Sequence, residues 1–356
     1  MGVGREDRAA IPDTISMTDR VLVTGISGFI AKHVALSLLR AGFAVRGTVR
    51  VLTTADKVRA TLVKHAADAT RLEFVAADLT ADAGWAEAVA GCRYVAHVAS
   101  PFPMSQPRDR EGLVPAARDG ALRVIGAALK AGAERVVMTS SMVAMAYRAN
   151  RPPTITFGEQ DWTDPDWPVL SAYVVSKTRA ELAAWDYVRQ AGAEARFATV
   201  NPGFVLGPAL DSDIGTSLRV IQMIMKGTYP ALPPTSFPII DARDLGELHV
   251  AALTKPAAAS RRLIGAADTL SMQQMGRELA KAFPAYAHKI PTHRVPAGLV
   301  RLAALFNPGL SAILPDLGTV PLADSRYVSE LTGVTFRPAA EAVRAAGASL
   351  IEHKLV

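Results

Sequence analysis

The chain has 356 residues, of which 50% are hydrophobic, so it is long enough to bury a substantial core in one large domain or two smaller ones. Its apolar runs are too short to span a bilayer, and we expect no membrane association. The net charge of +6 comes from basic residues scattered among acidic ones without a basic block. We therefore expect no nucleic-acid partner.

The rare residue types exclude further classes. The single cysteine, Cys92, cannot form an intramolecular disulfide, and we expect a buried apolar residue in a cytoplasmic protein. The histidines are scattered without metal-ligand spacing, so no metal is predicted. The segment TSSM lacks the Gly-x-Ser-x-Gly elbow of serine hydrolases. Residues 1–19 have no apolar core of a secretory signal, and we expect a flexible tail.

Short valine-rich runs alternate with alanine-rich helical patterns over the first 202 residues. The runs lie at 20–25, 44–50, 72–78, 94–100, 135–141 and 196–202. The helical patterns follow the first run through residue 39 and then lie near 55–66, 82–89, 112–131 and 169–190. Apolar strands that alternate with helices indicate an α/β fold with a doubly wound parallel sheet, the Rossmann architecture.

The alternation stops after residue 202. A helix is expected near 213–226, then a proline-rich stretch, a return strand at FPIIDARD, and helices near 242–253 and 271–282. Asp241 and Asp244 begin the first of these two helices, where capping is their expected use. We therefore predict a nucleotide-binding domain at 20–202 with return segments near 236–265. A smaller, partly discontinuous substrate lobe is expected at 203–235 and 266–356.

The stretch VLVTGISGFIAKH joins the first predicted strand to the first helix. Gly25 and Gly28 lie in the turn, where the backbone can approach a pyrophosphate placed on the helix N-terminus. We predict that this loop, with Ser27, Phe29 and Ile30, binds a dinucleotide.

The ends of the next two strands bear on the choice of dinucleotide. Arg50 stands where an NAD enzyme typically has an acidic residue for the ribose, and with Lys57 it favours the 2′-phosphate of NADP(H). Asp78, next to Leu79, is placed to meet the adenine amine. Two alternatives stay open: Arg50 and Lys57 as solvated surface charges, and Asp78 as a helix cap.

AYVVSKTRAELAAW places Tyr173 and Lys177 about 40° apart around a helix, so that both can reach one ligand. Polar residues also follow the fifth and sixth predicted strands, with Ser140 and Ser141 in the first case and Asn201 in the second. Together they suit hydride transfer between a nicotinamide and a carbonyl. Tyr173 would give the proton, and Lys177 would lower the phenol pKa and hold the ribose.

TGISGFIA, VRGTVR, ADL, HVASPF, TSSM, YVVSKTRAELAAW, NPGFVLGP and IIDARDL follow one another between about residues 20 and 255. In this order they resemble the extended short-chain dehydrogenase/reductases, and most closely the dihydroflavonol-reductase-like aldehyde and ketone reductases. The resemblance implies NADPH, bound in part by Arg50 and Lys57, and assigns the catalytic serine to Ser141. The cofactor contacts that it implies are Val98, Ala99, Ser100, Pro202 and Gly203, besides Tyr173 and Lys177. It also implies an apolar substrate pocket lined by Phe102, Met142, Met145 and Phe204.

Without the resemblance, the four pocket residues would be interpreted as core. Arg123 replaces an asparagine common in sugar-nucleotide epimerases, and the cinnamoyl-CoA reductase signature Asn-Trp-Tyr-Cys-Tyr is absent. The expected function is NADPH-dependent reduction of a small aldehyde or ketone by a monomer or homodimer. Two alternatives stay open, a sugar-nucleotide epimerase or dehydratase that retains NAD and a non-catalytic regulator that senses NADP.

Overall fold

The computed structural model describes residues 19–65, 67–101, 107, 109–306 and 313–356. The predicted tail at 1–19 therefore lies outside the described residues, except for Asp19.

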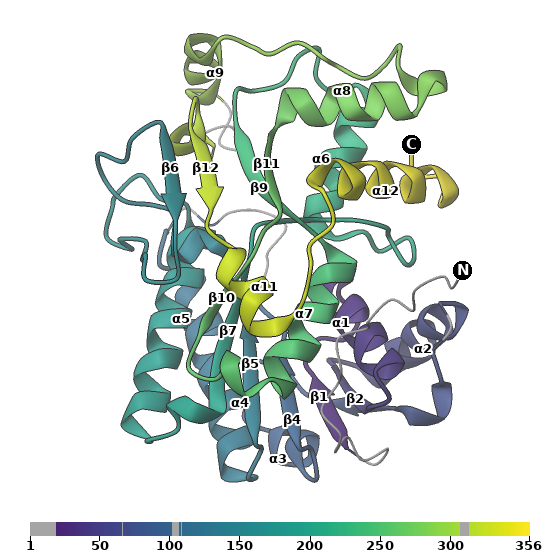
Figure 1. Cartoon of the computed structure of the whole chain (residues 1–356), viewed down its shortest axis with the longest axis vertical. Helices are drawn as coiled ribbons and strands as arrows, with labels where there is room; N and C mark the ends of the chain where they lie inside the picture. The colour runs from purple at the N-terminus through teal and green to yellow at the C-terminus, as the bar shows by residue number, and fades with distance from the viewer. Residues whose placement is uncertain (1–18, 66, 102–106, 108, 307–312) are drawn as a thin grey trace, which may run out of the picture.

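A seven-stranded parallel sheet forms the centre of the molecule, in the order β10-β7-β5-β4-β1-β2-β3 (Figure 1). The strands are β1 (Arg20–Val23), β2 (Ala44–Val49), β3 (Leu72–Ala76), β4 (Tyr94–His97), β5 (Arg135–Thr139), β7 (Phe197–Pro202) and β10 (Arg262–Gly265). The first six coincide with the predicted runs. The predicted doubly wound α/β fold is confirmed.

Helices cover both faces of this sheet, and strand alternation sends side chains to each. Val21 and Val23 pack in a core cluster with α1 and α7, whereas Leu22 packs in a second cluster with α3, α4 and α5. Against the first cluster lie α1 (Phe29–Arg40), α2 (Ala55–Lys64) and α7 (Ala242–Thr254). On the other face lie α3 (Trp85–Val89), α4 (Val114–Lys130) and α5 (Ala172–Gln190).

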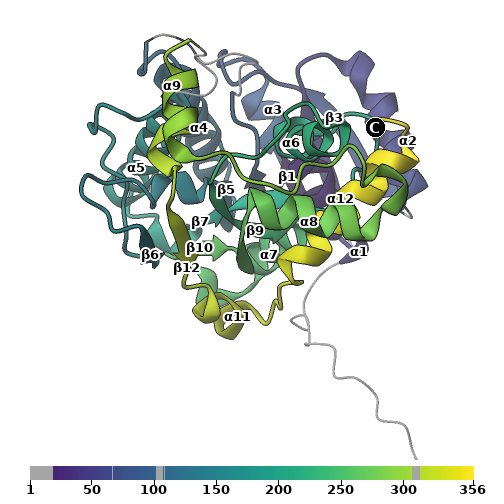
Figure 2. The same cartoon turned by 90° about the horizontal axis from the view of Figure 1, so that it is seen from above.

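A second lobe, the predicted substrate lobe, is built around two small sheets above the carboxyl edge of the central sheet (Figures 1 and 2). One has the order β11-β9-β8 and the other pairs β12 with β6 in parallel. The strands are β6 (Thr154–Phe157), β8 (Phe204–Leu206), β9 (Ser236–Asp241), β11 (Asp268–Ser271) and β12 (Val320–Ala323). The helices are α6 (Gly215–Lys226), α8 (Met272–Ala282), α9 (Ala297–Ala304), α11 (Arg326–Thr332) and α12 (Ala339–Glu352).

The return segments near 236–265 divide between the central sheet and the lobe, which differs from the predicted domain organisation. The expected return strand, β9, pairs with β8 and β11 in the lobe and not with the central sheet. Of these return segments, α7 packs on the central sheet and β10 joins it as the seventh strand, which the sequence patterns did not predict. Asp241 caps α7 through the Arg243 amide at 2.9 Å, which confirms its expected use.

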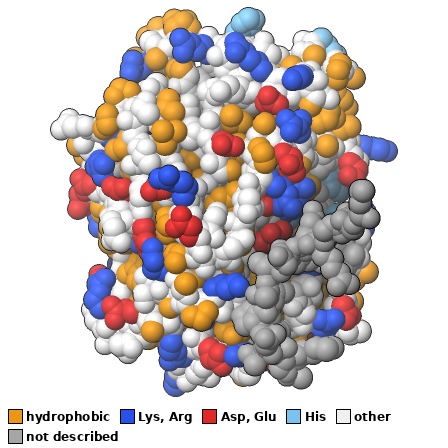
Figure 3. Space-filling model, in the orientation of Figure 1, with side chains coloured by type: hydrophobic (Ala, Val, Ile, Leu, Met, Phe, Trp, Pro, Cys, Tyr) orange, Lys and Arg blue, Asp and Glu red, His pale blue; other side chains and the backbone are white. Residues whose placement is uncertain are grey.

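The position of the cysteine and the distribution of charge can be compared with the composition. Cys92 is buried, and burial raises the pKa of its thiol. On the face in Figure 3, Lys and Arg side chains are interspersed with Asp and Glu and form no single basic stripe. Among the described residues, no helix combines the length and the apolarity needed to cross a bilayer.

Candidate active site

The glycine loop makes a tight turn between β1 and α1. Gly25 has φ +62°, and a Cβ atom there would meet the Cβ of Ala99 at 2.9 Å, so only glycine fits without displacing the end of β4. The Thr48 hydroxyl accepts a hydrogen bond from the Gly25 amide at 2.9 Å. Ser27 and Gly28 are exposed, and Gly28 is the N-cap of α1 without a side-chain cap. The free amides of this first turn are available to an anion.

The next two residues of the loop both pack on the main core cluster. The Phe29 side chain is buried in the main core cluster and meets His33 edge to face, with ring centroids 5.2 Å apart. Ile30 is half-buried against the same cluster. The Phe29 side chain is thus committed to packing, and its backbone is the part left for a ligand.

The predicted NADP-selecting cations lie beyond β2 and at the start of α2. Arg50 and Lys57 are both exposed, and neither makes a hydrogen bond or ion pair through its side chain among the described residues. Arg50 nevertheless lowers the pKa of Asp78 by its charge, so the two ends of β2 and β3 face one another. A pair of unpartnered cations is compatible both with a phosphate site and with the solvated-charge alternative.

Asp78 is already engaged by the backbone that follows it. Its Oδ1 atom accepts hydrogen bonds from the Thr80 amide at 2.8 Å and the Thr80 hydroxyl at 2.7 Å, and these bonds lower the pKa of the carboxyl group. These bonds close a local turn and do not cap a helix, because α3 begins only at Trp85 and has Gly84 as its N-cap. The neighbouring Leu79 packs on Gly120 of α4, and its carbonyl accepts a bond from Arg123 at 2.9 Å.

The end of β4 lies directly beside the glycine loop. Val98, Ala99 and Ser100 are half-buried, and the Ala99 amide donates to the Thr24 hydroxyl at 3.0 Å. These three residues therefore border the turn that the sequence assigns to the dinucleotide. Phe102, predicted to line the substrate pocket, lies outside the described residues.

The three predicted catalytic side chains come from two neighbouring elements. Ser141 follows β5 and is the N-cap of the 3-10 helix η3 (Met142–Ala144), whereas Tyr173 and Lys177 lie in the first two turns of α5. The Ser141 hydroxyl hydrogen-bonds to the Tyr173 hydroxyl. The Lys177 ammonium donates to the Thr139 carbonyl at 3.3 Å. The structure thus brings all three groups to one corner of the sheet's carboxyl edge.

Burial is the largest influence on the pKa values of Tyr173 and Lys177. It raises the pKa of Tyr173, and the hydrogen bond from Ser141 opposes the rise. It lowers the pKa of Lys177 to about 8, against the attraction of Glu181. The sequence predicts that Lys177 lowers the phenol pKa, but the phenol pKa is raised, because the loss of hydration outweighs the hydrogen bond with Ser141. The phenol keeps its proton at neutral pH.

The end of β7 brings the chain back across the same corner. Pro202 is buried, and the Gly203 amide donates to the Gly265 carbonyl at 2.9 Å. A Cβ atom at Gly203 would meet the Pro238 carbonyl at 2.3 Å, so this position needs glycine for the close approach of β9. Phe204 is half-buried and stacks on Phe237 with ring centroids 5.1 Å apart.

Two of the predicted pocket residues belong to the interior. Met142 and Met145 are 4% and 1% exposed and pack with Ile264 and Ala266 of the β10 segment. This is the core alternative that the sequence left open. Their side chains join the segment after Ser141 to the last strand of the central sheet.

Polar residues that the sequence interpretation did not select surround the predicted groups. His97 shares a hydrogen bond of 2.9 Å with Thr24, and burial lowers its pKa to about 3, so it is neutral. His97 is thus a buried histidine with its hydrogen bond satisfied. The buried pair of Glu181 and Arg262 lies behind Ser141 and Lys177, with Nε and Oε1 2.7 Å apart. The i+4 spacing from Lys177 could have identified Glu181, but no local signal marks Arg262.

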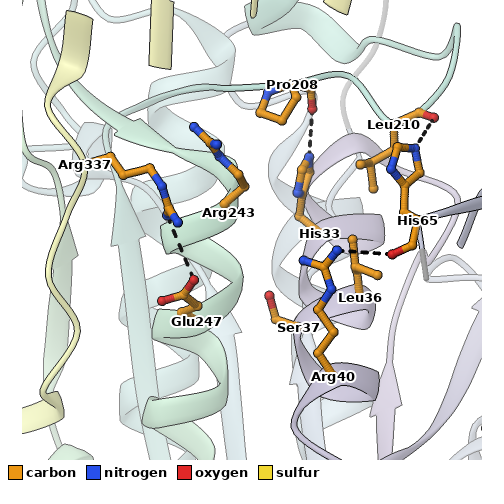
Figure 4. A pocket seen from close by; sticks show the side chains of 10 residues that line it. All are labelled: His33, Leu36, Ser37, Arg40, His65, Pro208, Leu210, Arg243, Glu247 and Arg337. Atoms are coloured by element: carbon orange, nitrogen blue, oxygen red, sulfur yellow. Dashed lines mark hydrogen bonds and ion pairs between the residues drawn. The ribbon is translucent and has the colours of Figure 1, made fainter. Parts of the chain in front are cut away.

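A separate cavity of about 230 Å³ lies between α1 and α7, and none of the predicted catalytic residues lines it (Figure 4). Two of its three arginines form ion pairs: Arg243 pairs with Asp241 at 2.7 Å, and Arg337 pairs with the buried Asp244, whereas Arg40 donates to the His65 carbonyl at 3.1 Å. His33 donates to the Pro208 carbonyl at 2.9 Å. No group of His, Cys, Asp or Glu suited to a metal ion occurs within the described part of the chain.

Comparison with curated sequences gives relatives among reductases. The chain is 35% identical over 248 residues to cinnamoyl-CoA reductase CAD2 of Medicago truncatula, which covers 68% of this chain and 75% of that protein. It is 32% identical to tetraketide alpha-pyrone reductase 2 of Arabidopsis thaliana, over 74% of this chain and 83% of the relative.

Solved structures share the fold over nearly the whole chain. Yeast methylglyoxal/isovaleraldehyde reductase Gre2, complexed with NADPH, superposes with a TM-score of 0.77 at 24% identity, covering 95% of this chain and 100% of that one. Vestitone reductase from alfalfa (Medicago sativa) gives a TM-score of 0.72 at 22% identity, with 95% and 99% covered.

The sequence model of the NAD dependent epimerase/dehydratase family matches residues 21–264. That span contains the glycine loop and the three residues Ser141, Tyr173 and Lys177. It also contains the seven strands of the central sheet, apart from Arg20 at the start of β1 and Gly265 at the end of β10. The chain belongs to this family of extended short-chain dehydrogenase/reductases, in its dihydroflavonol-reductase-like branch.

Proposed function

We propose that the protein is an NADPH-dependent reductase that converts an aldehyde or ketone into an alcohol. The observation that carries the proposal is the convergence of three groups. The Ser141 hydroxyl is hydrogen-bonded to the Tyr173 phenol. The Lys177 ammonium donates a hydrogen bond to the carbonyl of Thr139, two residues before Ser141. Relatives named as cinnamoyl-CoA, tetraketide alpha-pyrone and methylglyoxal/isovaleraldehyde reductases support carbonyl chemistry.

The residues at the carboxyl edge of the sheet fit a dinucleotide. The turn at Gly25 and Gly28 exposes the first amides of α1, which suit a pyrophosphate. Arg50 and Lys57 are exposed beside β2 and would hold a 2′-phosphate. Toward the other end, the Pro202–Gly203 turn would border the nicotinamide. NADPH, when bound, would supply the hydride for the carbonyl carbon.

The chain's own groups would handle the charge that develops on the carbonyl oxygen. Tyr173 would donate its proton to that oxygen, and the raised phenol pKa ensures that the proton is present before the reaction. The Ser141 hydroxyl would hold the oxygen in line with the phenol. Lys177 would stabilise the phenolate left behind and orient the ribose, as long as its ammonium remains protonated.

The direct experiment follows NADPH absorbance with purified protein and a panel of aliphatic aldehydes, aromatic aldehydes, β-keto compounds and cinnamoyl-CoA. Steady NADPH consumption with one class, much faster than with NADH, supports the proposal and identifies the substrate class. Protein that carries tightly bound NAD and interconverts sugar nucleotides without net NADPH oxidation would indicate the epimerase alternative. Stoichiometric NADPH binding without turnover of any carbonyl would indicate the regulator alternative.

A further inference from the structure

A fully buried carboxylate lies one helical turn beyond Lys177 on α5. Glu181 is 0% exposed and accepts hydrogen bonds from two strands. The Ser140 hydroxyl donates to its Oε2 atom at 2.5 Å and the Asn201 amide donates to the same atom at 2.7 Å. The Thr199 hydroxyl donates to Oε1 at 3.1 Å. One side chain therefore links α5 to the carboxyl ends of β5 and β7.

The counter-charge comes from the first residue of β10. Arg262 donates from Nε to Oε1 of Glu181 at 2.7 Å, and the two side chains are 7% and 0% exposed. Its remaining donors bind the Glu159 carbonyl at 2.8 Å and the Asp161 carbonyl at 2.6 Å. The guanidinium also stacks on Trp162, 3.6 Å from the ring centroid. These contacts hold the Arg262 guanidinium in one position, and its bond to Oε1 holds the Glu181 carboxylate in turn.

Each partner of Glu181 adjoins a residue of the proposed reaction. Ser140 immediately precedes Ser141, and Asn201 immediately precedes Pro202. The Asn201 amide also donates to the Ser141 carbonyl at 3.3 Å. Lys177 lies on the same face of α5, four residues before Glu181. The carboxylate therefore contacts the neighbours of the reacting groups without reaching the cleft itself.

We propose that Glu181 and Arg262 are positioning residues for the reaction. Glu181 holds the ends of β5 and β7 against α5 and keeps a negative charge beside the Lys177 ammonium, and Arg262 balances that charge. This inference rests on the proposed function. An ion pair with only a structural role would be equally well served by packed apolar side chains. The position of this pair, among the neighbours of Ser141, Lys177 and Pro202, assigns it a role in the chemistry.

The charges that surround Lys177 define how the pair acts. On its own helix, Tyr173 and Glu181 lie four residues before and after Lys177, and Glu181 interacts with its charge. His97 of β4 also interacts with that charge, and the Thr139 carbonyl of β5 accepts a hydrogen bond from the ammonium. Burial lowers the pKa of Lys177 to about 8 and Glu181 opposes this. His97 is neutral at working pH, because burial lowers its pKa to about 3. Glu181 is therefore the carboxylate that sustains the ammonium, and Arg262 limits its effect.

Two single substitutions test this inference with opposite expected results. In Glu181→Gln the negative charge is lost and Arg262 remains, so the Lys177 pKa falls. In Arg262→Gln the carboxylate is left unbalanced, so the Lys177 pKa rises. The pH at which kcat/KM for carbonyl reduction falls on the alkaline side should move down by about one unit in the first variant and up by about one unit in the second. The Glu181→Gln/Arg262→Gln double variant should return close to the unaltered protein.

Asp244→Asn provides a matched control, because Asp244 is also a fully buried carboxylate paired with an arginine, Arg337, but lies on α7. Its alkaline limb should not move. The inference would be overturned if kcat/KM fell at the same alkaline pH in all variants. It would also be overturned if that pH moved in the same direction in Glu181→Gln and Arg262→Gln. If Glu181→Gln does not fold, the upward shift in Arg262→Gln carries the test. An unaltered protein that reduces no carbonyl refutes the proposed function instead, before any variant is compared.

Discussion

The two ends of the proposed cofactor cleft are built in opposite ways. Around Ser141 and Lys177, which are 8% and 6% exposed, the polar groups are buried and hydrogen-bonded before any ligand arrives. Around Arg50 and Lys57 the charges are exposed, without hydrogen-bond or ion-pair partners among the described residues. The first end is preorganised, and the second leaves its charges in water.

This difference separates chemistry from selectivity. A buried hydrogen bond or charge acts through a low dielectric and depends on the exact fit of its neighbours, so a small change there should cost much activity. Exposed cations are screened by salt and depend less on the exact positions of their neighbours. A substitution of Arg50 or Lys57 should therefore alter which dinucleotide is bound more than how fast the bound dinucleotide reacts. The following measurements test that division.

The largest effect is expected at the buried end. Tyr173→Phe removes the proton donor and should lower kcat for carbonyl reduction by about a thousandfold, while NADPH affinity stays nearly unchanged. Steady-state kinetics and NADPH fluorescence titration measure the two quantities. Tyr187→Phe, on the same helix and 37% exposed, is the control and should keep full activity. Retention of most activity in Tyr173→Phe would refute the assigned donor.

At the exposed end, Arg50→Ala should reduce the preference for NADPH over NADH by about ten- to a hundredfold, because a charge-assisted contact to the 2′-phosphate is lost. The kcat reached at saturating NADPH should change little. The ratio of kcat/KM for the two cofactors is the measurement, and Arg189→Ala, whose side chain is 60% exposed at the end of α5, is the control. An unchanged ratio would leave Arg50 as a solvated surface charge.

The pH dependence should reveal the buried ammonium. The pKa of Lys177 is lowered to about 8, so the charged form prevails below that pH and is lost above it. Reduction should therefore be constant near neutrality and fall by about tenfold for each unit well above pH 8. A profile of kcat/KM from pH 6 to 10 measures the limb. Activity that persists undiminished at the upper end would show that the lysine charge is dispensable.

The smallest effect concerns stability and needs no substrate. Burial lowers the pKa of His97 to about 3 and the pKa values of His33 and His249 to about 4. Each histidine binds a proton more readily when the chain unfolds, so its contribution is present above about pH 6.5 and is lost as the pH falls toward 4. Thermal denaturation should show Tm falling by several degrees across that window. A flat Tm would contradict the burial of these three histidines.

The central fold could be predicted because its strands are locally recognisable. The valine-rich runs of β1, β2, β4, β5 and β7 carry their own apolar signal and alternate with amphipathic helices. The strands of the lobe do not. TITF and VPLA, which form β6 and β12, are short, partly exposed and widely separated, so only the folded chain shows that they pair.

The candidate site divides in the same manner. Spacing along one helix predicted that Tyr173 and Lys177 share a face, and the order of strand ends predicted that Ser141 would lie near them. The support behind them depends on Arg262, far along the chain in an unpredicted strand, and no local pattern could reveal it. The direction of the phenol pKa was also missed, since it depends on burial that a sequence does not display.

The parallel pairing of β6 with β12 has a consequence for how the protein is made. Thr154 lies opposite Val320, and the hydroxyl of Tyr327 reaches back to donate to the Arg262 carbonyl at 2.5 Å. Each contact joins a segment to one that is synthesised later in the chain. During translation the corner that bears Arg262 must wait for the last part of the chain to leave the ribosome, so catalytic competence should arrive as one of the final events of folding.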